Sequence, residues 1–307
     1  MQRSREDSIS LDLRILSVLL ALFFAAIHDP ALAQQSSRSP TNAAEAAAQA
    51  TGKIVFRPVP HNDWTPATQV VLNGKSYYPE SAEKPYSLQI STNTTSPIIR
   101  AEVRNGEMWT AAMGGNDTER AELDGAADHH PLNYPRGTEF WFAYQFLIEP
   151  GADQIATAGG YPGGPLAWGV IGQIHGNGAQ AAVPWGLSIV GGRLSIRTQT
   201  GNQKETIHWT APNKFVRNQV YDVVVRIKIT GRSDSTMTCW IDGIQVADSH
   251  DLAIGGPDAG NYVKIGIYRG WQRNGYPPLA VEVANVEHGT TSLMRRVTNR
   301  AAWPSVK

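Results

Sequence analysis

The chain has little cysteine, no excess charge of either sign and little helical periodicity. These features argue against a disulfide-stabilised fold, a nucleic-acid or membrane partner and a helical protein. Its 307 residues include one cysteine, so no internal disulfide can form and the core must be stable without one. Cys239, within TMTCWIDG, is predicted to be a buried strand residue. Lysine and arginine together number 27, as do aspartate and glutamate, a balance that argues against nucleic acid or an anionic membrane as the partner. A locally basic surface for an acidic ligand is compatible with this composition.

Long hydrophobic runs are also scarce, and the only one, ILSVLLALFFAA (15–26), lies near the N-terminus. Arg14 precedes it and the small-x-small sequence ALA (31–33) follows, which together predict a signal peptide over residues 1–33. An uncleaved anchor is the alternative, but the run is short for a bilayer span. We therefore expect a secreted or periplasmic protein without stable membrane association after cleavage. The polar, alanine-rich residues 34–51 are expected to form a flexible leader.

After residue 51 the sequence shows short segments at strand spacing, separated by Gly, Pro, Asn and Asp. Two pairs of segments flank the tight-turn dipeptides Gly191-Gly192 and Asp242-Gly243, which predict β-hairpins. No repeat and no change of composition divides the region, so residues 52–307 are predicted to form one all-β domain, a sandwich or a barrel. The clearest predicted strands are 96–105, 118–125, 139–150, 167–176, 185–200, 221–230, 236–249, 261–270 and 279–289.

Three of these strands carry, opposite an apolar face, side chains that bind or titrate. Because side chains alternate along a strand, each set shares one face. Burying such groups is costly, so their presence together indicates a ligand site. The residues are Arg120 and Glu122 in TERAELDG (118–125), Gln173 and His175 in GQIHG (172–176), and Tyr262, Lys264 and Tyr268 in NYVKIGIYRG (261–270).

These motifs, R-x-E-L, Q-I-H and Y-x-K-x-G-x-Y in this order, resemble the jelly-roll polysaccharide lyases, a group with alginate lyase, heparin lyase I and glucuronan lyase types. RAEVRNGEMW (100–109), before the first motif, is similar to the heparin lyase I and glucuronan lyase branch. The resemblance covers about residues 95–270. It implies a jelly-roll sandwich of two antiparallel sheets, concanavalin A-like, and β-elimination on a uronic-acid polysaccharide that gives 4,5-unsaturated products.

The chemistry of β-elimination explains these residue types. The enzyme removes the C5 proton beside a carboxylate, so the negative charge of that carboxylate must first be neutralised. Gln173 and Arg120 are suited to this as donors. By resemblance, His175 and Tyr268 transfer the protons: either His175 is the base and Tyr268 the acid, or Tyr268 serves as both. The sequence does not choose between the two assignments.

Four more residues are candidate substrate contacts: Lys264, Glu122, Arg269 and Tyr262. Glu122 could equally form an ion pair with Arg120. No cofactor or catalytic metal is predicted, because the sequence has no ligand-spaced cluster. A structural Ca²⁺ site in SHDLAIGGPDAGN (249–261) would have only Asp251 and Asp258 as carboxylates.

The predicted function is thus a secreted, monomeric polysaccharide lyase acting on an anionic polysaccharide, preferably an unsulfated, glucuronan-type polymer. Two alternatives stay open. A β-glucanase-like glycoside hydrolase would need two carboxylates across the scissile bond, and ELDGAAD (122–128) does not supply the required strand pattern. A non-catalytic carbohydrate-binding jelly roll would bind uronate without turnover.

Overall fold

The computed structural model describes nine stretches of the chain, all within the compact unit Ile54–Lys307. The predicted signal peptide (1–33), the predicted leader (34–51) and Asp258 lie outside the described residues. No helix in the described part has the length and apolar character that a membrane span requires. The described residues are 65–66, 70–109, 118–125, 134–152, 168–176, 182–202, 204–256, 260–270 and 277–307.

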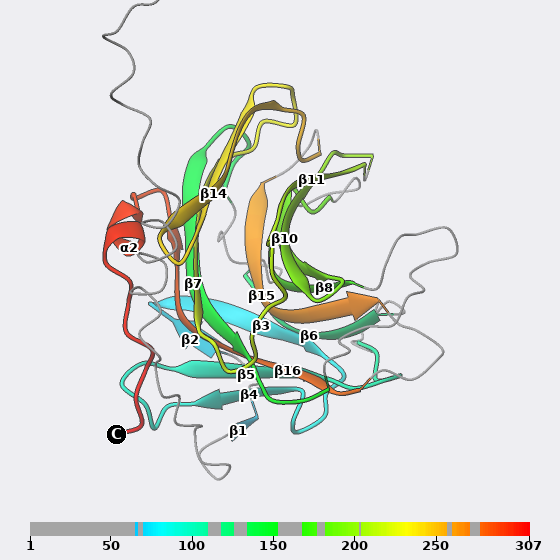
Figure 1. The fold of residues 1–307 in the computed structure, drawn as a ribbon, viewed down its shortest axis with the longest axis vertical. Helices are drawn as coiled ribbons and strands as arrows, with labels where there is room; N and C mark the ends of the chain where they lie inside the picture. Colours follow the sequence, from blue (N-terminus) through cyan, green and yellow to red (C-terminus); the bar gives the residue numbers. More distant parts are fainter. Residues whose placement is uncertain are drawn as a thin grey trace, which may run out of the picture. The chain divides into compact units, whose positions relative to one another are not determined.

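Two eight-stranded sheets make up the described part of the molecule (Figure 1), and every pairing between named strands is antiparallel. This confirms the predicted jelly-roll sandwich. The first sheet has the order β1 (Thr65–Pro66), β4 (Leu88–Ser91), β5 (Ile98–Val103), β16 (Leu279–Gly289), β7 (Glu139–Ile148), β12 (Tyr221–Lys228), β13 (Ser235–Ile241) and β14 (Ile244–Leu252). The second has the order β11 (Glu205–Thr210), β10 (Arg193–Gln199), β9 (Trp185–Val190), β8 (Trp168–Gly176), β15 (Asn261–Gly270), β6 (Thr118–Asp124), β3 (Lys75–Ser81) and β2 (Val70–Leu72).

Alternate residues of both sheets form one hydrophobic core, as the period of two predicts. Val223, Val225 and Ile227 of β12 are fully buried in it. Ile265 and Ile267 of β15 are buried in the same core, from the other sheet. The core therefore lies between the sheets, and the face of the second sheet that is turned away from it, here called the polar face, is left for the polar residues of β6, β8 and β15.

The two predicted hairpins are present. Gly191 and Gly192 connect β9 to β10, and Asp242 and Gly243 connect β13 to β14. All four residues have positive φ angles, as a two-residue turn of this hand requires. Cys239 is fully buried on β13, as predicted.

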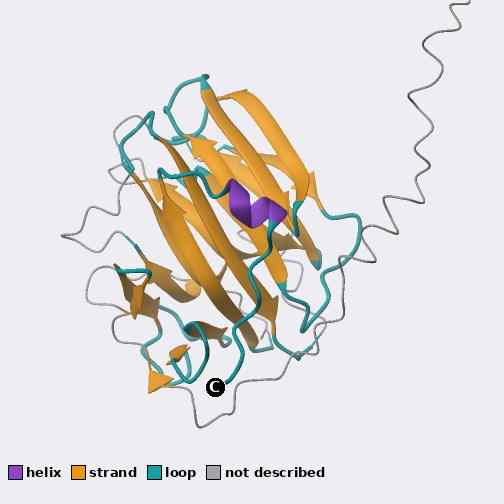
Figure 2. Cartoon of the chain, turned by 90° about the vertical axis from the view of Figure 1, so that its left-hand side faces the viewer, coloured by secondary structure: helices purple, strands orange, loops and turns teal. Residues whose placement is uncertain are grey.

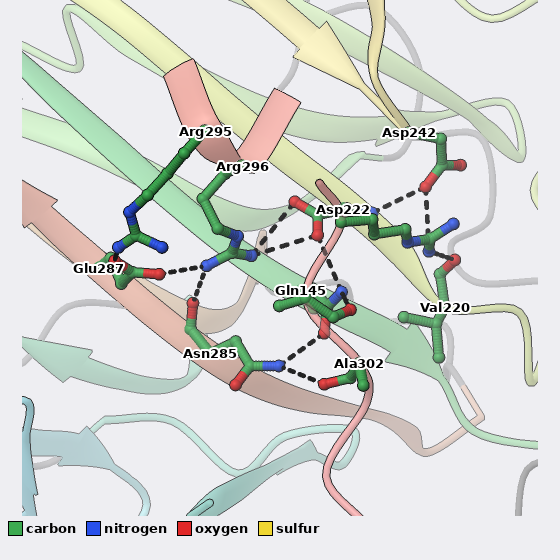
Figure 3. Close-up of polar contacts among 11 residues, drawn as sticks. Gln145, Val220, Asp222, Asp242, Asn285, Glu287, Arg295, Arg296 and Ala302 are labelled. Atoms are coloured by element: carbon green, nitrogen blue, oxygen red, sulfur yellow. Dashed lines mark hydrogen bonds and ion pairs between the residues drawn. The ribbon is translucent and has the colours of Figure 1, made fainter. Parts of the chain in front are cut away.

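The C-terminal segment, which includes the short helix α2 (Met294–Thr298), crosses the outer face of the first sheet (Figure 2). Arg296 of α2 is buried and donates to both oxygens of Asp222, each at 3.2 Å, and to Glu287 at 2.7 Å (Figure 3). Gln145 of β7 donates to the same Asp222 carboxylate at 2.8 Å. This network holds the C-terminal segment against the first sheet.

Candidate active site

Strands β6, β15 and β8 are neighbours in the second sheet, and they carry the three sequence motifs. Residues directly opposite each other on paired strands point to the same face of a sheet. The side chains of the motifs therefore gather on the polar face, as predicted. The opposed pairs are Tyr268 with Arg120, Lys264 with Gln173, and Tyr262 with His175.

An irregularity in β15 lies between the ends of this group. The register of β15 against β8 shifts between Ile265 and Tyr268, while its register against β6 runs on unbroken. Gly266, within the shift, has a φ of 142°, and a Cβ there would collide with the carbonyl oxygen of Ala121. Only glycine adopts this conformation readily. Bulges of this kind re-aim side chains next to active sites, and here the shift precedes Tyr268.

His175 is held by its Nδ1 atom. Nδ1 lies 2.9 Å from the carbonyl oxygen of Gly176 and 3.1 Å from the hydroxyl of Tyr262. A carbonyl oxygen only accepts hydrogen bonds, so the neutral ring carries its proton on Nδ1 and leaves the lone pair on Nε2. Burial, together with the charge of Lys264, lowers the pKa of His175 to about 4. The imidazole is therefore neutral at ordinary pH and can act as a base.

Gln173 and Glu122 form a buried pair beside His175. The amide nitrogen of Gln173 donates to Glu122 Oε1 at 2.7 Å, and both side chains are almost completely buried. Glu122 Oε2 lies 3.5 Å from Nε of Arg120. Burial raises the pKa of Glu122 above its usual range, against the opposing charge of Arg120. Glu122 thus orients Gln173 by a hydrogen bond and lies within ion-pair distance of Arg120, and the second N–H of the Gln173 amide is left to serve a carboxylate.

Arg120 also contacts two aromatic rings, and it pairs with a carboxylate, that of Glu80, which the sequence did not predict. Its guanidinium carbon lies 4.3 Å from the centre of the Tyr268 ring and 5.1 Å from that of Trp109. Its Nη1 donates to Glu80 of β3 at 2.6 Å. Arg120 is therefore fixed next to the proposed proton-transfer tyrosine.

Lys264 forms ion pairs with two carboxylates. Its Nζ lies 2.7 Å from Glu80 Oε2 and 3.1 Å from Asp124 Oδ2, and the side chain is 4% exposed. Burial alone would lower the pKa of Lys264, but Asp124 and Glu80 raise it above its usual value. The same contacts act on Glu80: burial opposes its charge, yet Lys264 and Arg120 lower its pKa to about 2. Both partners are thus charged at ordinary pH, and Lys264 is a fixed cation of the network.

Arg269, expected as a substrate contact, lies elsewhere. It follows Tyr268 on β15 and turns to the opposite face, where its side chain is fully buried. Its Nε donates to Glu119 of β6, which is also fully buried, and its Nη1 donates to the carbonyl oxygen of Pro277 at 2.8 Å. The structure therefore separates Arg269 from the residues of the polar face.

Glu80 and Asp124 are the residues of this network that the sequence reading missed. Asp124 continues the alternation of Arg120 and Glu122 on β6 and could have been found from it. Glu80 lies in KSYYPES, where Pro79 argues against a strand. The described residues contain no group of three or more His, Cys, Asp and Glu side chains arranged to hold a metal ion.

Comparison with known proteins identifies related folds. A family model described as "Polysaccharide lyase" matches residues 74–291 of the chain. The search of curated proteins finds no match. Among solved structures, an endo-β-1,4-glucuronan lyase from the fungus Trichoderma reesei is 18% identical, with a TM-score of 0.52 over 74% of this chain and 94% of that one. Alginate lyase A1-II′ is 13% identical, with a TM-score of 0.46 over 67% and 84% of the two chains. An alginate lyase from Pseudomonas aeruginosa is 16% identical, with a TM-score of 0.42 over 68% and 87%.

Proposed function

Because this chain belongs to the polysaccharide lyase family, we propose that it cleaves an unsulfated, glucuronan-type polymer, with His175 as base and Tyr268 as acid. The observation that carries this assignment is the contact of His175 Nδ1 with the carbonyl oxygen of Gly176. It leaves Nε2 with a lone pair, and the lowered pKa of about 4 keeps the ring neutral. His175 then takes the C5 proton, and the phenol of Tyr268 protonates O4.

The carboxylate of the reacting sugar needs donors that lower the charge next to C5. Gln173 and Arg120 supply N–H groups on the polar face, from strands on either side of β15. Gln173 is held by Glu122 and Arg120 by Glu80, so both donors need little rearrangement when the charge develops. This supports their assignment as the residues that stabilise the enolate-like intermediate. Tyr262, bonded to His175, is assigned the task of orienting the imidazole.

A second assignment, Tyr268 as both base and acid, is favoured by the position of Arg120. A guanidinium 4.3 Å from the ring centre stabilises the phenolate form that a tyrosine base requires. The two assignments differ in what His175 does: in the second it binds the substrate carboxylate and moves no proton. Under the second, His175→Gln should raise KM and leave most of kcat; under the first, it should abolish kcat.

The substrate preference and the location are parts of the same proposal. RAEVR (100–104), ahead of the R-x-E-L strand, resembles the branch that contains glucuronan lyases, and the chain has no excess of basic residues for sulfate groups. The apolar run 15–26 and the ALA sequence at 31–33 support export to the periplasm or the medium. N-terminal sequencing of the exported protein should find Gln34 first.

The test is the rise in ultraviolet absorbance of the unsaturated product on glucuronan, polymannuronate, polyguluronate, heparin and chondroitin. We expect turnover of glucuronan, and its loss in His175→Ala and in Tyr268→Phe. His208→Ala is the matched control: this half-buried histidine lies on β11 and bonds to Thr198 and Ser249. Retained activity in both site variants would refute the assignment of the proton-transfer residues.

A further inference from the structure

A single carboxylate oxygen of Glu80 bridges two cations that come from different strands. Oε2 of Glu80 lies 2.6 Å from Nη1 of Arg120 and 2.7 Å from Nζ of Lys264. Arg120 is on β6, the strand next to β3, and Lys264 is on β15, one strand further. The side chain of Glu80 is 12% exposed. Glu80 is thus built into the polar face, opposite Glu122 on the neighbouring strand.

The two cations need this carboxylate to remain side by side. Like charges at short range repel, and the repulsion grows where water is excluded. Lys264 also pairs with Asp124, and Arg120 approaches Glu122, whose raised pKa reflects its complete burial. Glu80 is the acid that contacts both cations directly, so it sets their separation as well as their charge balance.

We propose that Glu80 is a positioning residue of the lyase reaction, which holds Arg120 against Tyr268 and Lys264 beside Gln173. The inference rests on the catalytic roles proposed above, and it assigns Glu80 no contact with the sugar. Glu80 acts on the reaction in two ways. It positions Arg120, which carries the positive charge next to Tyr268, and its own negative charge changes the electrostatic potential at His175.

The groups that face Glu80 define what its removal would change. β6 contributes Arg120, Glu122 and Asp124, and β15 contributes Lys264. The other neighbour of β3 is β2, Val70–Leu72, which carries no charged side chain. On β8, His175 feels the positive charges of Lys264 and Arg120, which lower its pKa, and the negative charge of Glu80, which raises it. Removing the charge of Glu80 should therefore lower the pKa of His175 further.

The experiment compares Glu80→Gln, which keeps the shape and removes the charge, with Glu80→Asp, which keeps the charge. We expect Glu80→Gln to lower kcat by about 10- to 100-fold, the range of a misplaced catalytic group, with a smaller change in KM. The acid limb of its kcat/KM profile should move to lower pH. Glu80→Asp should recover part of the rate and the wild-type position of that limb.

Asp222→Asn is the matched control, because it breaks a buried ion pair between Asp222 of the first sheet and Arg296 of α2. It should lower thermal stability without moving the pH profile. A Glu80→Gln enzyme with wild-type kcat and pH profile, or with a loss explained by its folded fraction alone, would overturn the proposal.

An NMR titration of the His175 imidazole separates this inference from the substrate assignment. The resonance is identified by its absence in His175→Ala, and no polymer is needed. A lower His175 pKa in Glu80→Gln than in the wild type is expected even if glucuronan is not cleaved. An unchanged titration would refute the role of Glu80 whichever polymer is the substrate.

Discussion

Arg269 provides a sharp test of whether the placement of side chains on the two faces of β15 is right. Its guanidinium and the Glu119 carboxylate are both fully buried. Replacing Arg269 with methionine would keep much of the volume but remove the cation that pairs with the buried Glu119 carboxylate, which also accepts from the backbone N–H of Gly106 at 2.8 Å. The carbonyl oxygen of Pro277 would also lose its donor.

Breaking a buried ion pair by removing one partner typically costs about 3–5 kcal/mol. In a domain of this size each kcal/mol lowers Tm by about 2–4 °C, so Arg269→Met should lower Tm by about 6–20 °C. The double variant Glu119→Leu/Arg269→Met removes both charges and should recover much of this loss. Thermal unfolding followed by circular dichroism measures the double-mutant cycle of Glu119 and Arg269, with the free energies of unfolding compared at one temperature.

The control is Arg104→Met. Arg104 also pairs with a glutamate, Glu102, at 2.5 Å, but its side chain is 43% exposed. Exposed pairs contribute about 0–1 kcal/mol, so this variant should be near wild type in Tm. The kcat/KM of Arg269→Met, measured well below its Tm, should stay within about twofold of wild type, as for a substitution that leaves transition-state binding intact. Unchanged Tm with a tenfold higher KM would mean that Arg269 binds the substrate after all.

Two further predictions concern His175 and Gly266. Burial and the charge of Lys264 oppose protonation of His175 and lower its pKa to about 4. The acid limb of the kcat/KM profile should therefore lie near pH 4, well below the ordinary histidine pKa of 6.5. An acid limb near pH 6.5 in initial-rate measurements would show that His175 is not the base or is not buried as described. Gly266→Ala should lower stability by about 1–3 kcal/mol or more and lower kcat, because of its φ of 142° and the collision with Ala121. Gly169→Ala, whose Cβ would meet Ile267 at an ordinary 3.5 Å, is the control in urea unfolding, and equal stability of the two variants would contradict the bulge geometry.

The sequence alone predicted which motif residues share a face, because a sheet with one buried side enforces a period of two. Ile265 and Ile267 enter the core, and Lys264 and Tyr268 therefore reach the other side. The same alternation puts Arg269 on the core side, but a buried arginine is plausible only with an acidic partner. That partner is on another strand, and its register with β15 cannot be read from one sequence.

Glu80 was hidden for a related reason. The predicted strands do not include KSYYPES, and its Pro79, which cannot donate a ladder hydrogen bond, gives no strand signal. In the structure Pro79 lies opposite Leu123 of β6, and β3 is the last strand but one of its sheet. A proline is tolerated there near the sheet edge, and the strand beside it supplies the carboxylate that joins Arg120 to Lys264. The role of Glu80 becomes visible only from the pairing of β3 with β6.

The charge balance around Glu80 bears directly on the choice of polymer. Among the described residues of the network, the cations Arg120 and Lys264 face the acidic residues Glu80, Glu122 and Asp124, so the acids outnumber the cations. A sulfated chain would bring additional negative charge at each sugar, and the network has no surplus of cations to balance that charge. A chain with one carboxylate per sugar needs donors at that carboxylate alone, and Gln173 can supply one without a net charge. The network therefore favours an unsulfated uronate polymer, and faster turnover of heparin than of glucuronan would refute this reasoning.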